Sequence, residues 1–428
     1  MEKRAPESNR VEWESHRWFL GLDWARDHQD IVVLDSQGSI VLDLRIEHTS
    51  EGWHRLRERL ERVAGTSLSV VAATIETNCG PAVERLLAMG CTVYPLNPKA
   101  AQRYRDRKAP CGGKTDHLDA LSFADALRTD GHGWRRLEPE DPRMLELRLL
   151  CRDEIGLIEQ RTAMVNQLQQ ALHDYYPAAL DAFDDWTMPA AWAFVEQFPT
   201  SQALQEAGKR RWEKFLHCHH LYRPQTYPKR LEIFANATAF CGNEAVTKAK
   251  SMLAVSLAKQ LRVLQQQLKA YRTRINELFQ AHPDHDLFGS LPGVGEKLGP
   301  RLRSECGDDR RRFEDAQALQ CYAGTAPVSY QSGQIHRVKF RRACNKNLRT
   351  AVHQWADLSR AQCYWAQVYY SQKRKEGKSH AAALRCLGQR WLKILWKMWM
   401  TEKPYNEQLH LRNQTEHGSW VLTLTPAQ

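Results

Sequence analysis

Three features that would place a chain of 428 residues in a simple class are missing from this one. No two of its eleven cysteines are spaced C-x-x-C, so neither a zinc module nor a redox dithiol is indicated. Residues 1–15 are polar and lack the apolar core of a signal peptide, so we expect reduced thiols and a cytoplasmic protein. The apolar stretch 391–400 is short and interrupted by Lys393 and Lys397, which argues against a membrane span.

Acidic residues are missing from one segment of a chain whose net charge is +11. Between residues 337 and 349 the charged side chains are all basic: Arg337, Lys339, Arg341, Arg342, Lys346 and Arg349. Such a cluster suits a polyanion, because each phosphate contact releases condensed counterions. The segment therefore indicates nucleic acid, and the alternative is an ordinary solvated surface.

The first 130 residues alternate between strand and helix signals. We expect strands at 18–22, 31–34, 40–46, 68–75 and 91–96, with helices at 50–63, 81–89, 98–105 and 116–128. Residues 36–38 form a turn signal so short that its flanking strands must be antiparallel. This order predicts an α/β domain with a mixed sheet.

The rest of the chain reads as mostly helical. Apolar residues recur at helical spacing over 144–172 and 246–279, which predicts an antiparallel coiled-coil arm around an insert, 176–242. We expect later helices at 296–305, 346–370 and 379–399, with a loosely ordered tail after Pro404. The expected divisions are an N-terminal extension (1–15), an α/β domain (16–135), the arm with its insert (136–286), a C-terminal domain (287–403) and a polar tail (404–428).

Four carboxylates occupy informative positions in the N-terminal domain. Asp23 ends the first expected strand and Glu76 the fourth, while Asp116 and Asp119 share one side of a helix. If the two strands are neighbours, their ends lie about 5 Å apart. Four carboxylates gathered there would need cations, and two Mg²⁺ ions are the natural partners for phosphate chemistry. Taken singly, each of these residues is more often a turn residue or a helix cap.

At this point the sequence resembles a known family. Gly21-Leu22-Asp23, Ile75-Glu76-Thr77 and Lys114-Thr115-Asp116-His117-Leu118-Asp119 resemble the DEDD insertion-sequence transposases, which include the Piv-type DNA invertases. The C-terminal part adds Leu291-Pro292-Gly293-Val294-Gly295, Tyr322–Pro327 and Ser332-Gly333. The resemblance implies an RNase H/RuvC-like fold for the first domain and a transposase domain at the C-terminal end.

The resemblance also implies the roles of individual residues. Asp23, Glu76, Asp116 and Asp119 would bind Mg²⁺, and Ser332 would attack DNA to form a phosphoserine link. A serine hydroxyl needs activation by a base or a metal, and His336 is close in sequence. On the residues alone, Ser332-Gly333 is better explained as a polar turn, and Ser329 is the second candidate.

Further residues are expected to contact nucleic acid. Residues 291–295 resemble a helix-hairpin-helix turn, in which Gly293 and Gly295 would let backbone N–H groups approach a phosphate. The alternative is a plain helix connector. With Lys114 and the basic residues Arg337, Lys339, Arg341, Arg342 and Lys346, these glycines form the expected nucleic-acid contacts.

The family resemblance implies donor and target DNA, a guide (bridge) non-coding RNA and a homo-oligomer as partners, in a bacterial cytoplasm near the nucleoid. A transposase that uses the serine is the first hypothesis. The second is a structure-specific nuclease, such as a Holliday-junction resolvase, in which water attacks. The third is a non-catalytic nucleic-acid-binding protein, and the presence of all four carboxylates counts against it.

Overall fold

The computed structural model describes residues 13–108, 112–113, 115–236, 243–333 and 335–420. The chain forms two compact units, Met1–Pro139 and Glu140–Gln428. The described part of the chain has no helix that combines the length and apolarity needed to cross a membrane.

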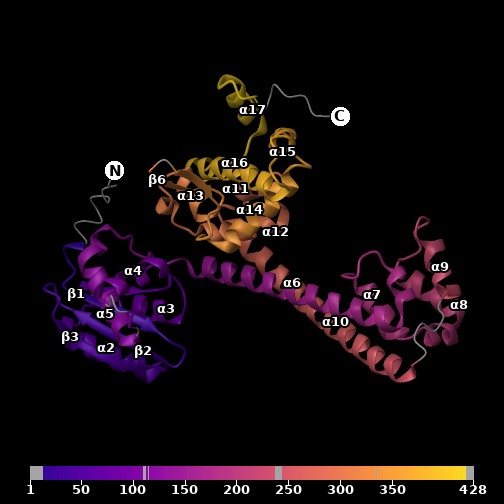
Figure 1. Ribbon diagram of the computed structural model, residues 1–428, viewed down its shortest axis with the longest axis horizontal. Helices are drawn as coiled ribbons and strands as arrows, with labels where there is room; N and C mark the ends of the chain where they lie inside the picture. The colour runs from indigo at the N-terminus through magenta and orange to yellow at the C-terminus, as the bar shows by residue number, and fades with distance from the viewer. Residues whose placement is uncertain (1–12, 109–111, 114, 237–242, 334, 421–428) are drawn as a thin grey trace. The chain divides into compact units, whose positions relative to one another are not determined.

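A five-stranded mixed sheet, in the order β3-β2-β1-β4-β5, forms the centre of the first unit (Figure 1). The sequence predicted this sheet and most of its elements. The expected strand 68–75 is shorter, because Leu68–Val70 forms a 3₁₀ turn. The elements are β1 (Trp18–Trp24), β2 (His28–Leu34), β3 (Ile40–Glu47), α2 (Ser50–Ala64), β4 (Val71–Ile75), α3 (Pro81–Ala88), β5 (Thr92–Pro95), α4 (Pro98–Lys108) and α5 (Asp116–Asp130).

Helices cover both faces of the sheet. Leu20 and Leu22 of β1 face a core shared with α2 and α3. On the other face, Phe19 packs with Leu127, and Val32 packs with Ala120 and Ala124, all three from α5. Because strand side chains alternate between faces, every second residue of β1 and β2 faces α5. That alternation decides which polar side chains share one face.

The arm in the second unit is an antiparallel pair of long helices, α6 (Pro142–Tyr175) and α10 (Glu244–Gln280), as the sequence predicted (Figure 1). Arg274 near the end of α10 contacts Glu146 near the start of α6, and Lys250 contacts Asp174 at the other end. The insert packs against one end of this pair as η3 (Pro177–Ala182), α7 (Pro189–Gln197), α8 (Ser201–Cys218) and α9 (Tyr227–Asn236).

The opposite end of the arm is packed into a helical core. Glu154 accepts hydrogen bonds from Arg272 and Arg301, and Glu305 from Arg152 and Asn345. The surrounding elements are α11 (His285–Gly289), α12 (Gly295–Cys306), α13 (Ala316–Tyr322), β6 (Val328–Ser332), β7 (Ile335–Lys339), α14 (Lys346–Ser359), α15 (Tyr364–Lys375), α16 (His380–Thr401) and α17 (Glu407–Glu416).

Two sequence expectations about this region are wrong. The expected helix 346–370 is two helices, because the chain turns after Ser359 and Gln362 accepts a hydrogen bond from the Gly293 backbone N–H. The tail after Pro404 is not loosely ordered in its described part. It forms α17, whose N-terminus is capped by the Asn406 side chain, and Trp420 stacks on Tyr369.

Candidate functional site

The first pair of carboxylates comes from two neighbouring strands. β1 and β4 are parallel, and Leu22 pairs with Ile75 at the end of their ladder. Asp23 is the next residue of β1, and Glu76 directly follows the end of β4. Gly21 and Ala72 face α5, so the alternation directs Asp23 and Glu76 to that same face.

Helix α5 lies directly on β1 beside this pair. A Cβ atom on Gly21 would come within 2.0 Å of the Ala120 carbonyl oxygen and 2.5 Å of the Ala124 nitrogen. Only glycine therefore fits at this crossing. Asp119 and Asp116 precede Ala120 on the helix, whose N-terminus is capped by the Thr115 side chain. The close packing therefore places Asp116 and Asp119 beside the end of β1, on the side of the sheet that α5 covers.

Basic side chains neutralise the helix carboxylates. Asp119 is 2% exposed and forms an ion pair with Arg105 from α4. Asp116 lies 3.3 Å from His28 Nε2 and 3.7 Å from an Arg45 guanidinium nitrogen. Since a buried carboxylate is costly without a counter-charge, these contacts indicate positions that a cation would also stabilise.

Sequence reasoning missed two residues of this site, His28 and Asp30. Asp30 pairs with Asp23 in the antiparallel β1–β2 ladder and faces α5 as Val32 does. It is 6% exposed and accepts two hydrogen bonds from Arg45, which raise the pKa of that arginine. The signal lay in the register: once β1 and β2 form a hairpin, the residue opposite Asp23 belongs to the site.

The donor set fits a hard divalent cation. In the described part of the chain, His28, Asp30 and Asp116 offer ligand atoms that all lie within 4.8 Å of one another. Asp23, Glu76 and Asp119 supply further carboxylate oxygens on the same face. Carboxylate oxygens are the ligands that Mg²⁺ prefers, so the residues present could hold such an ion.

Ser332, the expected nucleophile, ends the first strand of an exposed hairpin in the second unit. β6 and β7 pair antiparallel, with Gln331 opposite His336 and Tyr330 opposite Arg337. Alternation places Ser332 on the same face as Tyr330, Arg337 and Lys339. His336 lies on the opposite face, so this hairpin does not present it to the serine as a base. Ser329, the second candidate, also lies on the opposite face.

The basic residues around the hairpin divide into two kinds. Arg337, Lys339, Arg342 and Lys346 are exposed. Arg341 is half-buried instead and donates to the carbonyl oxygens of Ala326 and Pro327, so it fixes the base of the hairpin. Lys339 lies 4.9 Å from the centre of the Tyr330 ring, which is itself 61% exposed. Exposed cations beside an exposed aromatic ring are typical of a nucleic-acid contact surface.

The Gly293–Gly295 turn is packed into the C-terminal core. A Cβ on Gly293 would lie 2.7 Å from the Ser359 nitrogen, and its N–H donates to Gln362. Gly293 therefore has a structural reason to be glycine, whereas Gly295 is exposed and opens α12. Lys114, the remaining expected contact, lies outside the described residues.

Comparisons with known proteins match both halves of this description. A family model for the DEDD domain of IS110 elements, described as "Transposase", matches residues 20–177, which include all four carboxylates. A second, described as "Transposase IS116/IS110/IS902 family", matches residues 285–371, which include Ser332 and the basic segment.

Two relatives extend the similarity over nearly the whole chain, and a third matches part of it. The "Mini-circle putative transposase for IS117" of Streptomyces coelicolor is 32% identical over 92% of this chain and 97% of the relative. The "Insertion element IS900 uncharacterized 42 kDa protein" of Mycobacterium paratuberculosis is 30% identical over 91% and 97%. The "Pilin gene-inverting protein" of Moraxella bovis is 29% identical over 29% of this chain and 39% of its own length.

Proposed function

The chain belongs to the IS116/IS110/IS902 family of transposases, and from that premise we propose that it cuts and rejoins DNA with two chemical groups. One is a magnesium-binding set of carboxylates, Asp23, Glu76, Asp116 and Asp119. The other is the hydroxyl of Ser332. The observation that carries the proposal is the close packing of α5 on β1 at Gly21, because it holds the helix of Asp116 and Asp119 against the strand that contains Asp23.

The position of each carboxylate supports its proposed role as a magnesium ligand. Asp23 lies on β1 and Glu76 follows the end of the neighbouring strand β4, directly after the pair Leu22–Ile75. Asp116 and Asp119 stand on a helix held against β1, with Asp30 and His28 beside them. Bound Mg²⁺ supplies positive charge to a phosphate oxygen and lowers the pKa of an attacking group. Arg105 pairs with Asp119 and Arg45 with Asp116, and these contacts orient the two helix carboxylates.

In the proposed serine chemistry, the Ser332 oxygen attacks a backbone phosphorus as its proton leaves. The bond from that phosphorus to one deoxyribose oxygen breaks, so a phosphoserine ester replaces the phosphodiester. The freed hydroxyl of a second DNA end can then attack the ester and restore a phosphodiester. Because one ester is exchanged for another, joining requires no external energy source. Arg337 and Lys339, on the same face as Ser332, are suited to hold the flanking phosphates.

The proposed reaction has three further partners or conditions. We propose a bridge RNA that pairs with donor and target DNA, a homo-oligomer, and action in the bacterial cytoplasm at the nucleoid. The serine and the carboxylates lie in separate compact units, which suits a site shared between subunits. Mixing Ser332→Ala chains with Asp119→Asn chains tests this sharing. Recovered cleavage supports it, and no recovery in proven mixed oligomers shows that each chain builds its own site.

The carboxylate assignment is tested by strand cleavage with the full protein, its co-purified RNA and a plasmid that carries the insertion element. Asp23→Asn and Asp119→Asn should each abolish cleavage in Mg²⁺ while nucleic-acid affinity stays near normal. Replacing Mg²⁺ by Ca²⁺ should permit binding but not cleavage, because calcium coordinates more loosely. The matched control is Asp43→Asn, which removes an exposed carboxylate bound to His117. Normal recombination by either site variant would refute the assignment.

The second candidate function is a nuclease with the same carboxylates in which water attacks the phosphate. Among the described residues of the hairpin, no histidine or carboxylate shares the face of Ser332, and this observation favours water as the alternative nucleophile. The two functions differ in one product, a covalent protein–DNA link.

A further inference from the structure

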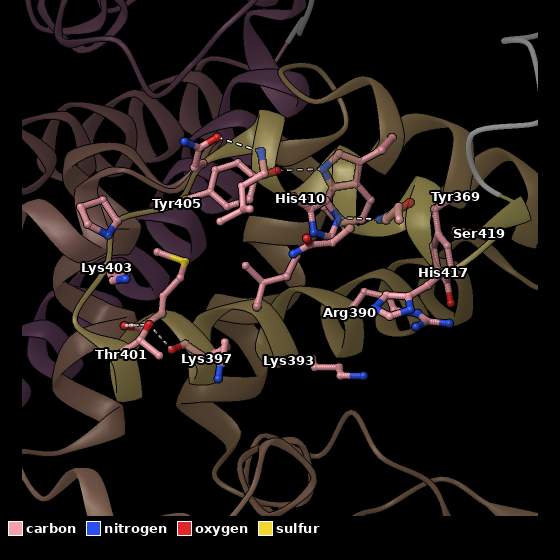
Figure 2. A pocket seen from close by; sticks show the side chains of 18 of the residues that line it. Tyr369, Arg390, Lys393, Lys397, Thr401, Lys403, Tyr405, His410, His417 and Ser419 are labelled. Atoms are coloured by element: carbon pink, nitrogen blue, oxygen red, sulfur yellow. Dashed lines mark hydrogen bonds between the residues drawn. The ribbon is translucent and has the colours of Figure 1, made fainter.

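A cavity of about 870 Å³ lies between α15, α16 and α17, away from the hairpin that carries Ser332. Its walls combine one face of α16, the aromatic residues Trp365 and Tyr369 of α15, and the segment from Lys403 to Trp420. The volume is that of a small-ligand site. Figure 2 shows Arg390, Lys393 and Lys397 along one side, with Tyr405 and His410 across from them.

The charge of this cavity has one sign. Arg390, Lys393 and Lys397 follow each other at helical spacing on α16, and Lys403 adds a fourth cation. No aspartate or glutamate lines the cavity, and in the described part of the chain none of these four cations has a carboxylate within ion-pairing distance. Elsewhere in this unit arginines are commonly paired, as Arg303 and Arg310 are with Asp284. Four unpaired cations around one cavity indicate an anionic ligand.

Flat aromatic groups form the other half of the site. Trp420 stacks on Tyr369 with ring centres 5.6 Å apart and planes at 24°. The Arg390 guanidinium lies 5.5 Å from the Tyr369 ring centre, and Lys373 lies 5.5 Å from Tyr369 and 5.6 Å from Trp420. An aromatic pair framed by cations is suited to stack a nucleobase while its phosphate meets the lysines.

Hydrogen bonds hold the segment that closes the cavity. The Tyr405 backbone N–H donates to Ser290 Oγ, and its hydroxyl accepts from Trp365 Nε1. Asn406 caps α17 through the Leu409 N–H. Asn413 and Gln414 add side-chain amides to the lining, which can bond to base edges. The cavity is therefore built from fixed walls that carry both charge and hydrogen-bonding groups.

From these observations we propose that the α15–α17 cavity binds an unpaired nucleotide of a single-stranded nucleic acid. A duplex does not present a base for stacking inside a cavity of this size, whereas an unpaired strand can insert one. A purely apolar ligand would gain nothing from the four cations that line the cavity. This site is distinct from the proposed serine and carboxylate chemistry and does not depend on it.

The test is binding by the full chain carrying Ser332→Ala, so that cleavage plays no part. Fluorescently labelled single strands of oligouridine RNA and oligothymidine DNA are titrated at several salt concentrations. The double variant Lys393→Gln/Lys397→Gln should flatten the salt dependence for single strands by about 1.4 in the log–log slope, at about 0.7 per lost contact. Trp420→Ala should weaken binding about fivefold to 150-fold, the range measured for one stacked base.

Matched controls separate the cavity from general charge and from stability. Lys248→Gln/Lys259→Gln removes two exposed lysines of α10. This control should change the salt slope and the single-strand affinity less than the cavity variants do. Lys393 and Lys397 are exposed, so their replacement should leave the melting temperature unchanged. Strands that contain 5-iodouracil, irradiated and mapped by mass spectrometry, should crosslink within residues 365–420.

The RNA and DNA arms identify the polymer, since tighter binding and cavity crosslinks in one arm assign the site to that strand. Crosslinks confined to the 328–342 hairpin, or cavity variants that bind like the α10 control, would overturn the proposal. If a mononucleotide competes for the cavity as strongly as the single strand does, the proposal that the cavity binds a polymeric strand is overturned. None of these outcomes bears on the serine chemistry, so failure here is distinguishable from failure of the proposed function.

Discussion

Replacing Gly21 by alanine should separate the two pairs of carboxylates. The new Cβ would lie 2.0 Å from the Ala120 carbonyl oxygen, a backbone atom that no side-chain rotation can remove. A normal carbon–oxygen contact requires at least about 3 Å, so α5 must retreat by about 1 Å. Overpacking of this kind costs about 1–3 kcal/mol of folding stability. The retreat also carries Asp116 and Asp119 away from Asp23 and Glu76.

The expected effect on catalysis exceeds the effect on stability. A misplacement of about 1 Å in a catalytic group costs about 100-fold in rate. We therefore expect Gly21→Ala to fold with a lowered melting temperature and to cleave DNA about 100-fold more slowly at temperatures where it is fully folded. Thermal denaturation and single-turnover cleavage measure the two effects on the same preparation.

Another glycine supplies the control. A Cβ on Gly52, in α2, would lie 2.2 Å from the Glu47 carbonyl oxygen, so Gly52→Ala should destabilise the same unit to a similar degree. It does not stand between β1 and α5, and its folded fraction should cleave normally. If Gly21→Ala retains full stability and full activity, or if Gly52→Ala loses as much activity as Gly21→Ala, the close crossing does not position the carboxylates.

Three further predictions concern the second unit. Arg342→Ala should flatten the salt dependence of duplex binding by about 0.9 without changing stability, because that side chain is exposed. Arg341→Ala should also loosen the hairpin, which amide hydrogen exchange of β6 and β7 would detect, and equal exchange in both variants would contradict the bracing role. Burial raises the pKa of the Glu154 carboxyl, but the hydrogen bonds from Arg301 and Arg272 outweigh burial and hold that pKa below its ordinary value of 4.5. A carboxyl whose pKa is lowered in the folded state contributes stability that is fully present above pH 4.5 and is lost as the pH falls through its folded-state pKa. The urea concentration at the midpoint of unfolding should therefore drop in that acid range. It should drop less steeply in Glu154→Gln, which lacks the titrating carboxyl. A midpoint with the same acid slope in both proteins would refute this.

The periodicity of apolar residues predicted the helices and strands of this chain better than it predicted the contacts between them. Alternation and the 36–38 turn were enough for the mixed sheet, and apolar spacing was enough for the antiparallel arm, because both patterns reflect which face is buried.

The errors arose where tertiary contacts override local pattern. The apolar spacing continues through 346–370, but Ser359 and Gln362 turn the chain to meet Trp391 and Gly293. The polar composition after Pro404 concealed α17, although Asn406 is a good N-cap.

The residues of the candidate site likewise divide into those that the sequence predicted and those that it missed. Asp23, Glu76, Asp116 and Asp119 stood out because each occupies a strand end or helix start. His28 and Asp30 did not, because they precede the apolar part of β2 and join the site only through the register with β1. The cavity between α15, α16 and α17 combines residues from three helices, and no spacing along the sequence predicts that juxtaposition.

The central claim is that Ser332 becomes covalently attached to DNA. The most direct measurement is to denature the reaction of the full protein with end-labelled DNA, its RNA and Mg²⁺, and to map any protein–DNA adduct by mass spectrometry. The account predicts a phosphodiester link on Ser332, lost in Ser332→Ala and retained in Ser329→Ala. Efficient cleavage by Ser332→Ala with no adduct in either protein would show that water is the nucleophile, and it would contradict the account.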